Sequence, residues 1–164
     1  MTIATGSPAP AFSLPNAADD RTFSLNEGLR GGPVIVGLYK SSCRASKLTL
    51  PVLQKLYETY PADRIAIWGL ALDSANITAS FARRYALRLP LLIDGEGYPT
   101  GQAYGITETP TIFMIEPSEV VAWQMAGFDR TALEAVNQEI ARRLDLPAAD
   151  LSATMEDDPA HLHG

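Results

Sequence analysis

Two apolar stretches of the chain have the pattern of buried central strands. Residues 34–39 (Val-Ile-Val-Gly-Leu-Tyr) and 65–72 (Ile-Ala-Ile-Trp-Gly-Leu-Ala-Leu) are apolar at nearly every position. Strands that are apolar on both faces are typical of the middle of a parallel sheet covered by helices. Residues 91–94 are a shorter candidate strand, closed by the Gly-Glu-Gly of residues 95–97. The pattern therefore predicts a buried sheet.

Helical spacing of apolar residues begins at Cys43 and runs to Tyr60. The positions that recur every four residues are Leu48, Val52, Leu56 and Tyr60. Pro51 lies inside this pattern, and we expect it to kink the helix without ending it. Since the spacing continues to Tyr60, one helix is predicted over the whole segment.

Two further helices are predicted later in the chain. Residues 76–86 have a helical pattern, and residues 131–144 form a last helix with one apolar face. Thr131-Ala-Leu-Glu134 is a capping-box sequence for the start of that last helix. Pro147 is expected to stop it.

Candidate hairpins lie at both ends of this alternating region. Residues 12–14 and 22–24 are short strands with a turn over residues 16–20, and residues 111–115 and 120–125 flank a second turn. Strands that alternate with helices pair in parallel, and a late hairpin adds antiparallel strands. We therefore predict an α/β fold with a mixed central sheet, helices on both of its faces and an N-terminal β-hairpin.

The length of 164 residues fits one domain. We assign it to residues 1–146 and expect residues 147–164 to be an acidic, disordered tail. Of the net charge of −6, four charges come from Asp150, Glu156, Asp157 and Asp158, which leaves −2 on the rest. The chain has no basic field for nucleic acid or anionic lipid. Its first residues lack a secretory pattern, so the expected location is the cytoplasm.

The single cysteine, Cys43, is the main candidate for chemistry. One cysteine excludes an intramolecular disulfide and a multi-cysteine zinc site. Its predicted place at a helix N-terminus, beside Lys40, Arg44 and Lys47, favours the thiolate. The alternative is a buried cysteine that acts as a small hydrophobic residue, which the polar flanking residues disfavour.

Three segments resemble one known family. Residues 39–46 (Tyr-Lys-Ser-Ser-Cys-Arg-Ala-Ser) with Pro51 look like the active-site segment of thioredoxin-like proteins. Residues 6–14 (Gly-Ser-Pro-Ala-Pro-Ala-Phe-Ser-Leu) resemble the opening of the redoxin branch, which holds the alkyl hydroperoxide reductase/thiol-specific antioxidant proteins and the TlpA- and ResA-like reductases. Residues 104–113 resemble the segment that carries the family's cis-proline, here Pro110. The resemblance implies a thioredoxin-like three-layer α/β/α sandwich.

The resemblance also implies roles for individual residues. Cys43 would be the attacking thiol, with Arg44 and Ser46 beside it. Thr109 and Pro110 would hold the substrate, together with Lys40 and Ser42. An ordinary proline at the start of a strand is the alternative for Pro110.

Gly127 matches a glycine that follows the family's last strand. Without a side chain it would let a substrate backbone approach, although a plain turn explains it equally well.

Two departures from the family leave three functions open. Ser46 replaces the second cysteine of Cys-x-x-Cys, so Cys43 would need an external thiol, such as glutathione or a partner protein, to complete a thiol-disulfide cycle. Lys40 and Val36 replace the threonine and proline of the peroxidase branch, which weakens but does not remove a one-cysteine, antioxidant peroxidase. A non-catalytic binding module is the third reading. None of the three implies a bound cofactor or metal.

Overall fold

The computed structural model of the protein describes residues 1–19 and 21–164 and is built on a five-stranded sheet. The strand order is β5-β4-β3-β6-β7, with β3 in the centre. The bounds are Val34–Tyr39 for β3, Ala66–Ala71 for β4, Leu91–Ile93 for β5, Thr111–Ile115 for β6 and Val121–Ala126 for β7.

The sheet is mixed, as the sequence predicts. Strands β3, β4 and β5 pair in parallel, whereas β6 is antiparallel to both β3 and β7. The N-terminal hairpin is also present, with β1 (Ser13–Pro15) antiparallel to β2 (Thr22–Ser24). Asp20, in the predicted hairpin turn, lies outside the described residues.

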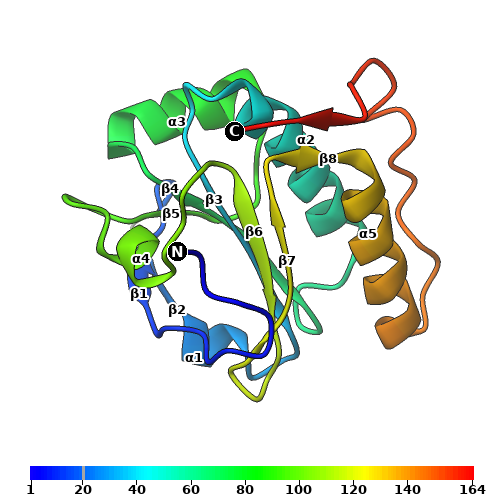
Figure 1. Cartoon of the computed structure of the whole chain (residues 1–164), viewed down its shortest axis with the longest axis horizontal. Helices are drawn as coiled ribbons and strands as arrows, with labels where there is room; N and C mark the ends of the chain where they lie inside the picture. The colour runs from blue at the N-terminus through cyan, green and yellow to red at the C-terminus, as the bar shows by residue number, and fades with distance from the viewer. Residues whose placement is uncertain (20) are drawn as a thin grey trace.

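Helices lie on both faces of the sheet and complete three layers (Figure 1). Helices α2 (Arg44–Thr59), α3 (Ala75–Arg84) and α5 (Arg130–Leu144) contribute to one core cluster. The other cluster contains residues from the N-terminal segment and from the short helix α1 (Leu25–Gly28). Neither α1 nor the short helix α4 (Pro99–Ala103) is predicted by the sequence pattern, because each spans little more than one turn.

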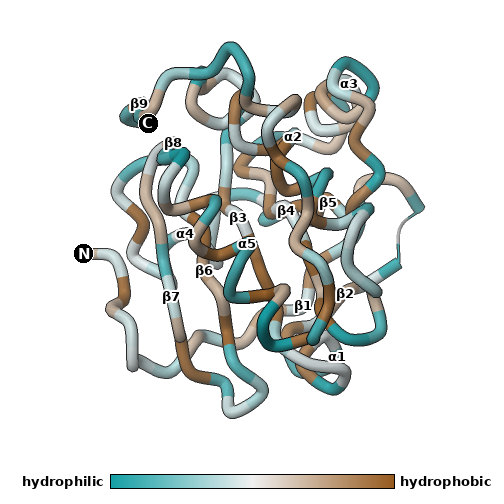
Figure 2. The backbone as a smooth tube through the Cα atoms, turned by 90° about the vertical axis from the view of Figure 1, so that its right-hand side faces the viewer, coloured by the Kyte–Doolittle hydropathy of each residue, from teal (hydrophilic) through white to brown (hydrophobic). Residues whose placement is uncertain are grey.

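Successive side chains of β3 point to opposite faces of the sheet and so belong to two different core clusters. Ile35 and Tyr39 belong to the cluster with α2 and α5, while Val36 and Leu38 belong to the cluster on the opposite face. This follows from the period of two along a strand. Figure 2 shows hydrophobic residues along the central strands and hydrophilic residues mainly in the outer loops and turns.

Helix α2 continues through Pro51, as predicted, and ends at Thr59. The predicted start of the last helix is wrong by one residue, and its cap is a different side chain. Helix α5 begins at Arg130, and its N-cap is Asp129, whose carboxylate accepts a hydrogen bond of 3.0 Å from the Ala132 N–H. Aspartate is among the strongest N-cap residues, so it displaces the capping role expected of Thr131.

The expectation of a disordered tail over residues 147–164 differs from the structure. Leu151 and Met155 are 1% and 2% exposed and lie in the core cluster of α2 and α5. A buried polar network holds Ala149: its N–H donates to the Tyr60 hydroxyl at 3.1 Å, and its carbonyl accepts from the Asn137 amide at 2.8 Å. Composition alone suggested disorder, but a few well-placed apolar residues bury enough surface to order the segment.

The last residues form strand β9 (His161–Leu162), which pairs antiparallel with β8 (Phe128–Asp129). Figure 1 shows β9, in red, running beside β8 across one end of the main sheet. None of the described helices is long and apolar enough to cross a bilayer.

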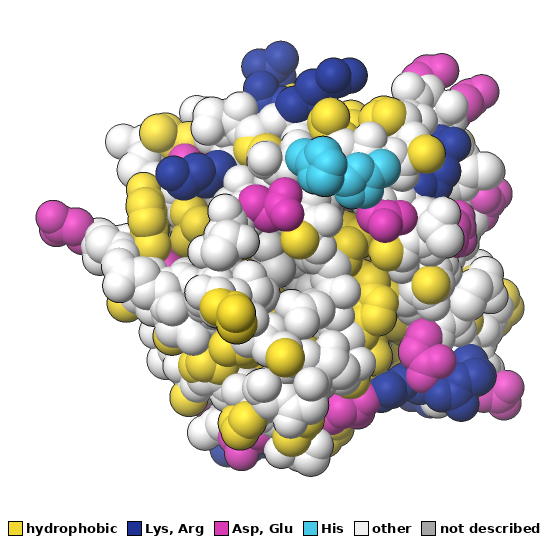
Figure 3. Space-filling model, in the orientation of Figure 1, with side chains coloured by type: hydrophobic (Ala, Val, Ile, Leu, Met, Phe, Trp, Pro, Cys, Tyr) yellow, Lys and Arg dark blue, Asp and Glu magenta, His cyan; other side chains and the backbone are white. Residues whose placement is uncertain are grey.

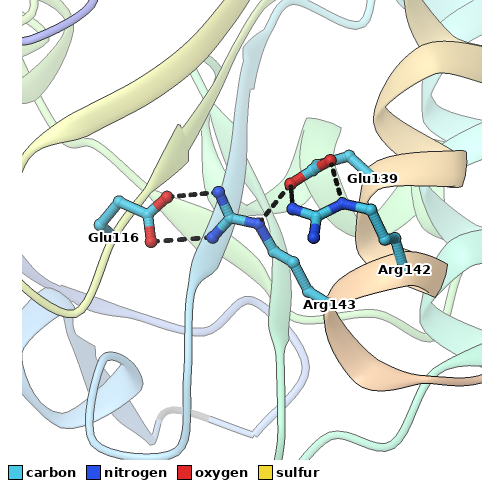
Figure 4. A network of polar contacts seen from close by, with 4 residues as sticks. All are labelled: Glu116, Glu139, Arg142 and Arg143. Atoms are coloured by element: carbon cyan, nitrogen blue, oxygen red, sulfur yellow. Dashed lines mark hydrogen bonds and ion pairs between the residues drawn. The ribbon is translucent and has the colours of Figure 1, made fainter.

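An ion-pair network joins α5 to the end of β6 (Figure 4). The guanidinium of Arg143 contacts both carboxylate oxygens of Glu116, at 2.8 and 2.6 Å. Its Nε also donates to Glu139 at 2.8 Å, and Glu139 pairs in turn with Arg142. These bonds tie the C-terminal turn of α5 to the loop after β6.

Candidate active site

The turn between β3 and α2 places Cys43 at the N-cap of α2. The Cys43 N–H donates to the Lys40 carbonyl at 3.1 Å, and the Cys43 carbonyl accepts the first helical bond, from Lys47, at 3.1 Å. The Ser41 N–H donates to the Asp73 carboxylate at 2.8 Å. The turn is thus fixed from both sides, and the sulfur lies at the positive end of the helix dipole.

The sulfur contacts a segment distant in sequence. The Cys43 thiol donates a hydrogen bond of 3.2 Å to the Thr109 carbonyl, although the two residues are 66 positions apart. The Thr109–Pro110 peptide bond is cis, as the resemblance implies. The structure therefore brings together Cys43 and the Thr109–Pro110 segment at the carboxyl end of β3.

Hydrogen bonding lowers the pKa of the Cys43 thiol below its ordinary value. The largest single influence is partial burial, which raises the pKa because it disfavours the charged thiolate. The backbone N–H and hydroxyl of Ser46 outweigh it, with further contributions from the Thr109 side chain and the Ala45 backbone. The principal causes are thus hydrogen bonds, whereas the sequence suggested charges on Lys40, Arg44 and Lys47.

Ser46 lies one helical turn after Cys43 and is 0% exposed. Its hydroxyl oxygen accepts a hydrogen bond of 3.4 Å from the Lys40 N–H. With the oxygen so engaged, the hydroxyl proton is free to point to the sulfur. The Ser46 side chain is one of the causes of the lowered pKa of Cys43, in agreement with this arrangement.

The three other predicted site residues differ in whether they face the hollow beside the sulfur or the solvent: Lys40, Ser42 and Arg44. Lys40 lines a hollow of about 470 Å³ together with Thr109, and its ammonium group lies 5.4 Å from the centre of the Tyr98 ring. Ser42 and Arg44 are exposed on the surrounding surface. Lys40 is therefore close to the predicted substrate site, whereas the side chains of Ser42 and Arg44 face solvent.

Sequence reasoning missed Asp73 and the last residues of the chain. Asp73 follows β4, the parallel neighbour of β3, and the carboxyl ends of such strands meet at one edge of the sheet. That rule could have identified Asp73. No local pattern predicts the second feature, the return of residues 162–164 to the Thr109 segment. In residues 1–19 and 21–164, no group of three or more His, Cys, Asp or Glu side chains is arranged to hold a metal.

Known proteins are similar to this chain in sequence and in fold. The thioredoxin-like protein YneN of Bacillus subtilis is 28% identical over 88% of this chain and 81% of its own length. A thiol:disulfide interchange protein DsbE of Xylella fastidiosa is 29% identical over 87% of this chain and 68% of its own. The crystal structure of a putative DsbE from Chlorobium tepidum covers 87% of this chain and 99% of its own, with a TM-score of 0.77 and 24% identity.

The family itself is established by a match over most of the chain. Residues 5–124 match the model of the AhpC/TSA family, and this range contains Cys43, Ser46 and the Thr109–Pro110 segment. The fold class and the redoxin resemblance are thus both confirmed. This chain belongs to the AhpC/TSA family and has a thioredoxin-like fold.

Proposed function

We propose that this protein is a thiol-disulfide oxidoreductase that works with Cys43 alone and regenerates through an external thiol. The observation that carries the proposal is the position of the Cys43 sulfur, at the N-cap of α2 and 3.2 Å from the Thr109 carbonyl. The lowered pKa of that thiol supports it, since the thiolate is the nucleophile in disulfide exchange.

Cys43 would exchange disulfides in two balanced steps. In the first, the Cys43 thiolate attacks one sulfur of a substrate disulfide, a mixed disulfide forms, and the other substrate sulfur leaves as a thiolate. In the second, an external thiolate attacks the mixed disulfide, Cys43 is released as a thiolate, and the external thiol is left disulfide-bonded to the substrate. A further external thiol then reduces that product.

An external thiol is needed because the residue one helical turn after Cys43 is a serine, Ser46. A cysteine at this position could attack the mixed disulfide one helical turn away, but a hydroxyl cannot form a disulfide. The Ser46 hydroxyl would instead donate a hydrogen bond to the Cys43 thiolate and favour its ionised form, in agreement with the lowered pKa of Cys43. A small thiol such as glutathione, or a partner protein with a free thiol, would complete the cycle.

The substrate would bind to the segment before Pro110 as an extended chain. The Thr109 backbone lies beside the sulfur, and backbone groups at a strand end can pair with an added peptide. The hollow lined by Lys40, Tyr98 and Thr109 would take a side chain or the leaving thiol. Substrates would therefore be disulfides carried on exposed, extended polypeptide.

A one-cysteine peroxidase is the competing proposal. The protein lacks the threonine hydroxyl that would contact peroxide in such an enzyme. The corresponding residue is Lys40, whose side chain lies over the Tyr98 ring. For this reason we place disulfide exchange first.

Reaction of the purified protein with oxidised glutathione tests the proposal. We expect one glutathione to bind to Cys43, detected by intact mass, and to be removed by excess reduced thiol. In the Ser46→Cys variant the adduct should be lost without added thiol, because the new cysteine forms an internal disulfide with Cys43 and expels glutathione as a thiol. Cys43→Ser is the control and should bind no glutathione.

Two results would overturn disulfide exchange. Failure of Cys43 to form the adduct, although iodoacetamide alkylates it, would favour a binding module. Conversion of Cys43 to sulfenic acid by micromolar peroxide, much faster than its reaction with any disulfide, would favour the peroxidase.

A further inference from the structure

Residues 161–164 return across the candidate active site. The Arg130 N–H donates to the Ala160 carbonyl at 2.9 Å, and β9 then pairs with β8, with Leu162 opposite Phe128 and His161 opposite Asp129. Beyond β9, the Gly164 N–H donates to the Glu108 carboxylate at 2.9 Å. Figure 3 shows the two histidine side chains, in cyan, on the surface of this face with carboxylates close by.

Gly164 lies against the same carbonyl group that Cys43 contacts. A Cβ atom at Gly164 would fall 1.7 Å from the Thr109 oxygen, so the Gly164 backbone is packed directly on this peptide. The Thr109 oxygen is also the acceptor of the Cys43 thiol, at 3.2 Å. The last residue of this segment is therefore separated from the sulfur by a single carbonyl group.

Gly127 is the second contact. It has a φ of +72°, and a Cβ there would fall 2.8 Å from the Leu162 oxygen and 3.5 Å from the His163 Cα. Gly127 also donates its N–H to the Pro110 carbonyl at 2.8 Å, so it lies beside the Thr109–Pro110 segment. The backbone that Gly127 admits is that of residues 162–163 of the same chain.

We infer that residues 161–164 occupy the groove between Thr109 and Gly127 in place of an extended substrate and restrain the reaction of Cys43. Extended backbone fills this groove, which is the form in which a peptide adds to a strand end. A disulfide-bearing peptide must displace the segment before its sulfur reaches Cys43. A small reagent need not, because the Cys43 side chain is only partly buried.

The contacts of the segment indicate that displacement is feasible. β9 spans two residues, and His161, His163 and Gly164 are exposed. Residues before it are held far more firmly, with Leu151 and Met155 buried. The segment can thus leave the groove by local opening while the rest of the tail stays packed.

The inference rests on the proposed disulfide exchange. Its test compares the rates at which Cys43 reacts with a small reagent and with a peptide disulfide. The proteins are the full chain, a chain that stops after Ala160, and Gly164→Ala, whose Cβ would collide with Thr109. Each is reacted with iodoacetamide and with an extended peptide that carries a mixed disulfide. Gly6→Ala is the matched control, because a Cβ at Gly6 has no neighbour within 4 Å and the position also has a positive φ, of +91°.

We expect the shortened chain and Gly164→Ala to react about tenfold faster with the peptide disulfide, and with little change toward iodoacetamide, because the restraint lies in the fraction of chains with an open groove. Gly6→Ala should leave both rates unchanged. Far-UV circular dichroism and the thermal midpoint show whether each variant is folded.

The outcomes separate the two proposals. If iodoacetamide alkylates Cys43 and the peptide disulfide reacts equally with the full and shortened chains, the restraint is refuted and disulfide exchange stands. If the peptide disulfide reacts with none of the three proteins, disulfide exchange itself fails. Hydrogen exchange of the Leu162 and Phe128 amides tests the restraint without any reaction of Cys43. A lack of protection of these amides in the full chain would also refute the restraint.

Discussion

The backbone N–H of Lys40 donates a hydrogen bond of 3.4 Å to the hydroxyl oxygen of Ser46, across the turn that carries Cys43. The bond occupies a lone pair of the hydroxyl and leaves its proton for the Cys43 sulfur. The same contact connects the end of β3 to the first turn of α2. Ser46 thus acts on the shape of the turn and on the ionisation of the thiol together.

Replacing Ser46 with alanine should raise the pKa of Cys43. The variant loses the hydroxyl hydrogen bond to the thiolate, and a hydrogen bond to a charged group contributes roughly 1.5–3 kcal/mol when well shielded. Since Cys43 is partly exposed, we expect the smaller part of that range, a fall of about tenfold in thiolate fraction at a pH below the pKa. The rate of iodoacetamide alkylation against pH measures it.

Ser42→Ala is the matched control for this measurement. Ser42 lies in the same turn, but its side chain is exposed. The control should leave the titration of Cys43 unchanged. Equal titration curves for Ser46→Ala and the unaltered protein would remove Ser46 from the account of the thiol.

The stability of the protein relative to Cys43→Ser should rise with pH. The pKa of Cys43 is lowered in the folded state, so between the folded and unfolded pKa values the unfolded chain binds more protons. The stabilisation is complete above the unfolded pKa, about 8.5, and is lost as the pH falls through the folded pKa. Because the side chain is partly exposed, we expect a change below about 1 kcal/mol.

Urea denaturation of both proteins across this pH range checks the prediction. The difference between their free energies of unfolding is the quantity of interest, because other titrating groups cancel in it. A difference that stays constant with pH would mean that the fold does not favour the thiolate.

Asn137→Leu should loosen the tail and lower the stability of the whole domain. Asn137 is 0% exposed, donates to the Ala149 carbonyl at 2.8 Å and accepts from the Ala149 N–H at 3.1 Å. The substitution leaves the Ala149 carbonyl without the amide that it accepts from, which costs roughly 1–3 kcal/mol for a buried group. Gln138→Leu, on the adjacent exposed position of α5, should have little effect.

Thermal unfolding and limited proteolysis measure these two variants. Cleavage after residue 146 should be faster in Asn137→Leu than in Gln138→Leu. Equal cleavage rates in the two variants would show that apolar burial of Leu151 and Met155 holds the tail without the polar network.

Arg143→Met should destabilise the protein more than Arg142→Met. Arg143 bonds to both Glu116 and Glu139 with 28% of its side chain exposed, whereas Arg142 pairs with Glu139 alone and is 71% exposed. Exposed pairs contribute about 0.2–1 kcal/mol, so we expect close to 1 kcal/mol for Arg143 and little for Arg142. A double-mutant cycle with Glu116→Gln isolates the bridge.

The ion pairs that Glu139 makes with Arg142 and Arg143 should also weaken with acid. Hydrogen bonds from Arg142 and Arg143 lower the pKa of Glu139 from 4.5 to about 2. The carboxylate is favoured in the folded state, so its stabilisation is present above pH 4.5 and is lost as the pH falls toward about 2. An Arg143→Met effect that is undiminished near this lower limit would contradict the assignment.

The sequence predicted the features that depend on local order along the chain. Buried strands, the long helix through Pro51 and the thiol at its start follow from periodicity and from the chemistry of a few residues. The family resemblance added Thr109 and Pro110, which no periodicity would have associated with Cys43. The predictions from periodicity hold because each rests on neighbours within a turn or a strand.

The tertiary structure decided what surrounds the sulfur and what covers it. Asp73, the Thr109 carbonyl and Gly164 reach the region of Cys43 from distant parts of the chain, and the tail that carries Gly164 looked too acidic and polar to fold. Composition measures average apolar content, whereas order depends on whether a few residues such as Leu151 and Met155 find a cavity that fits them. Only the packed chain contains that information.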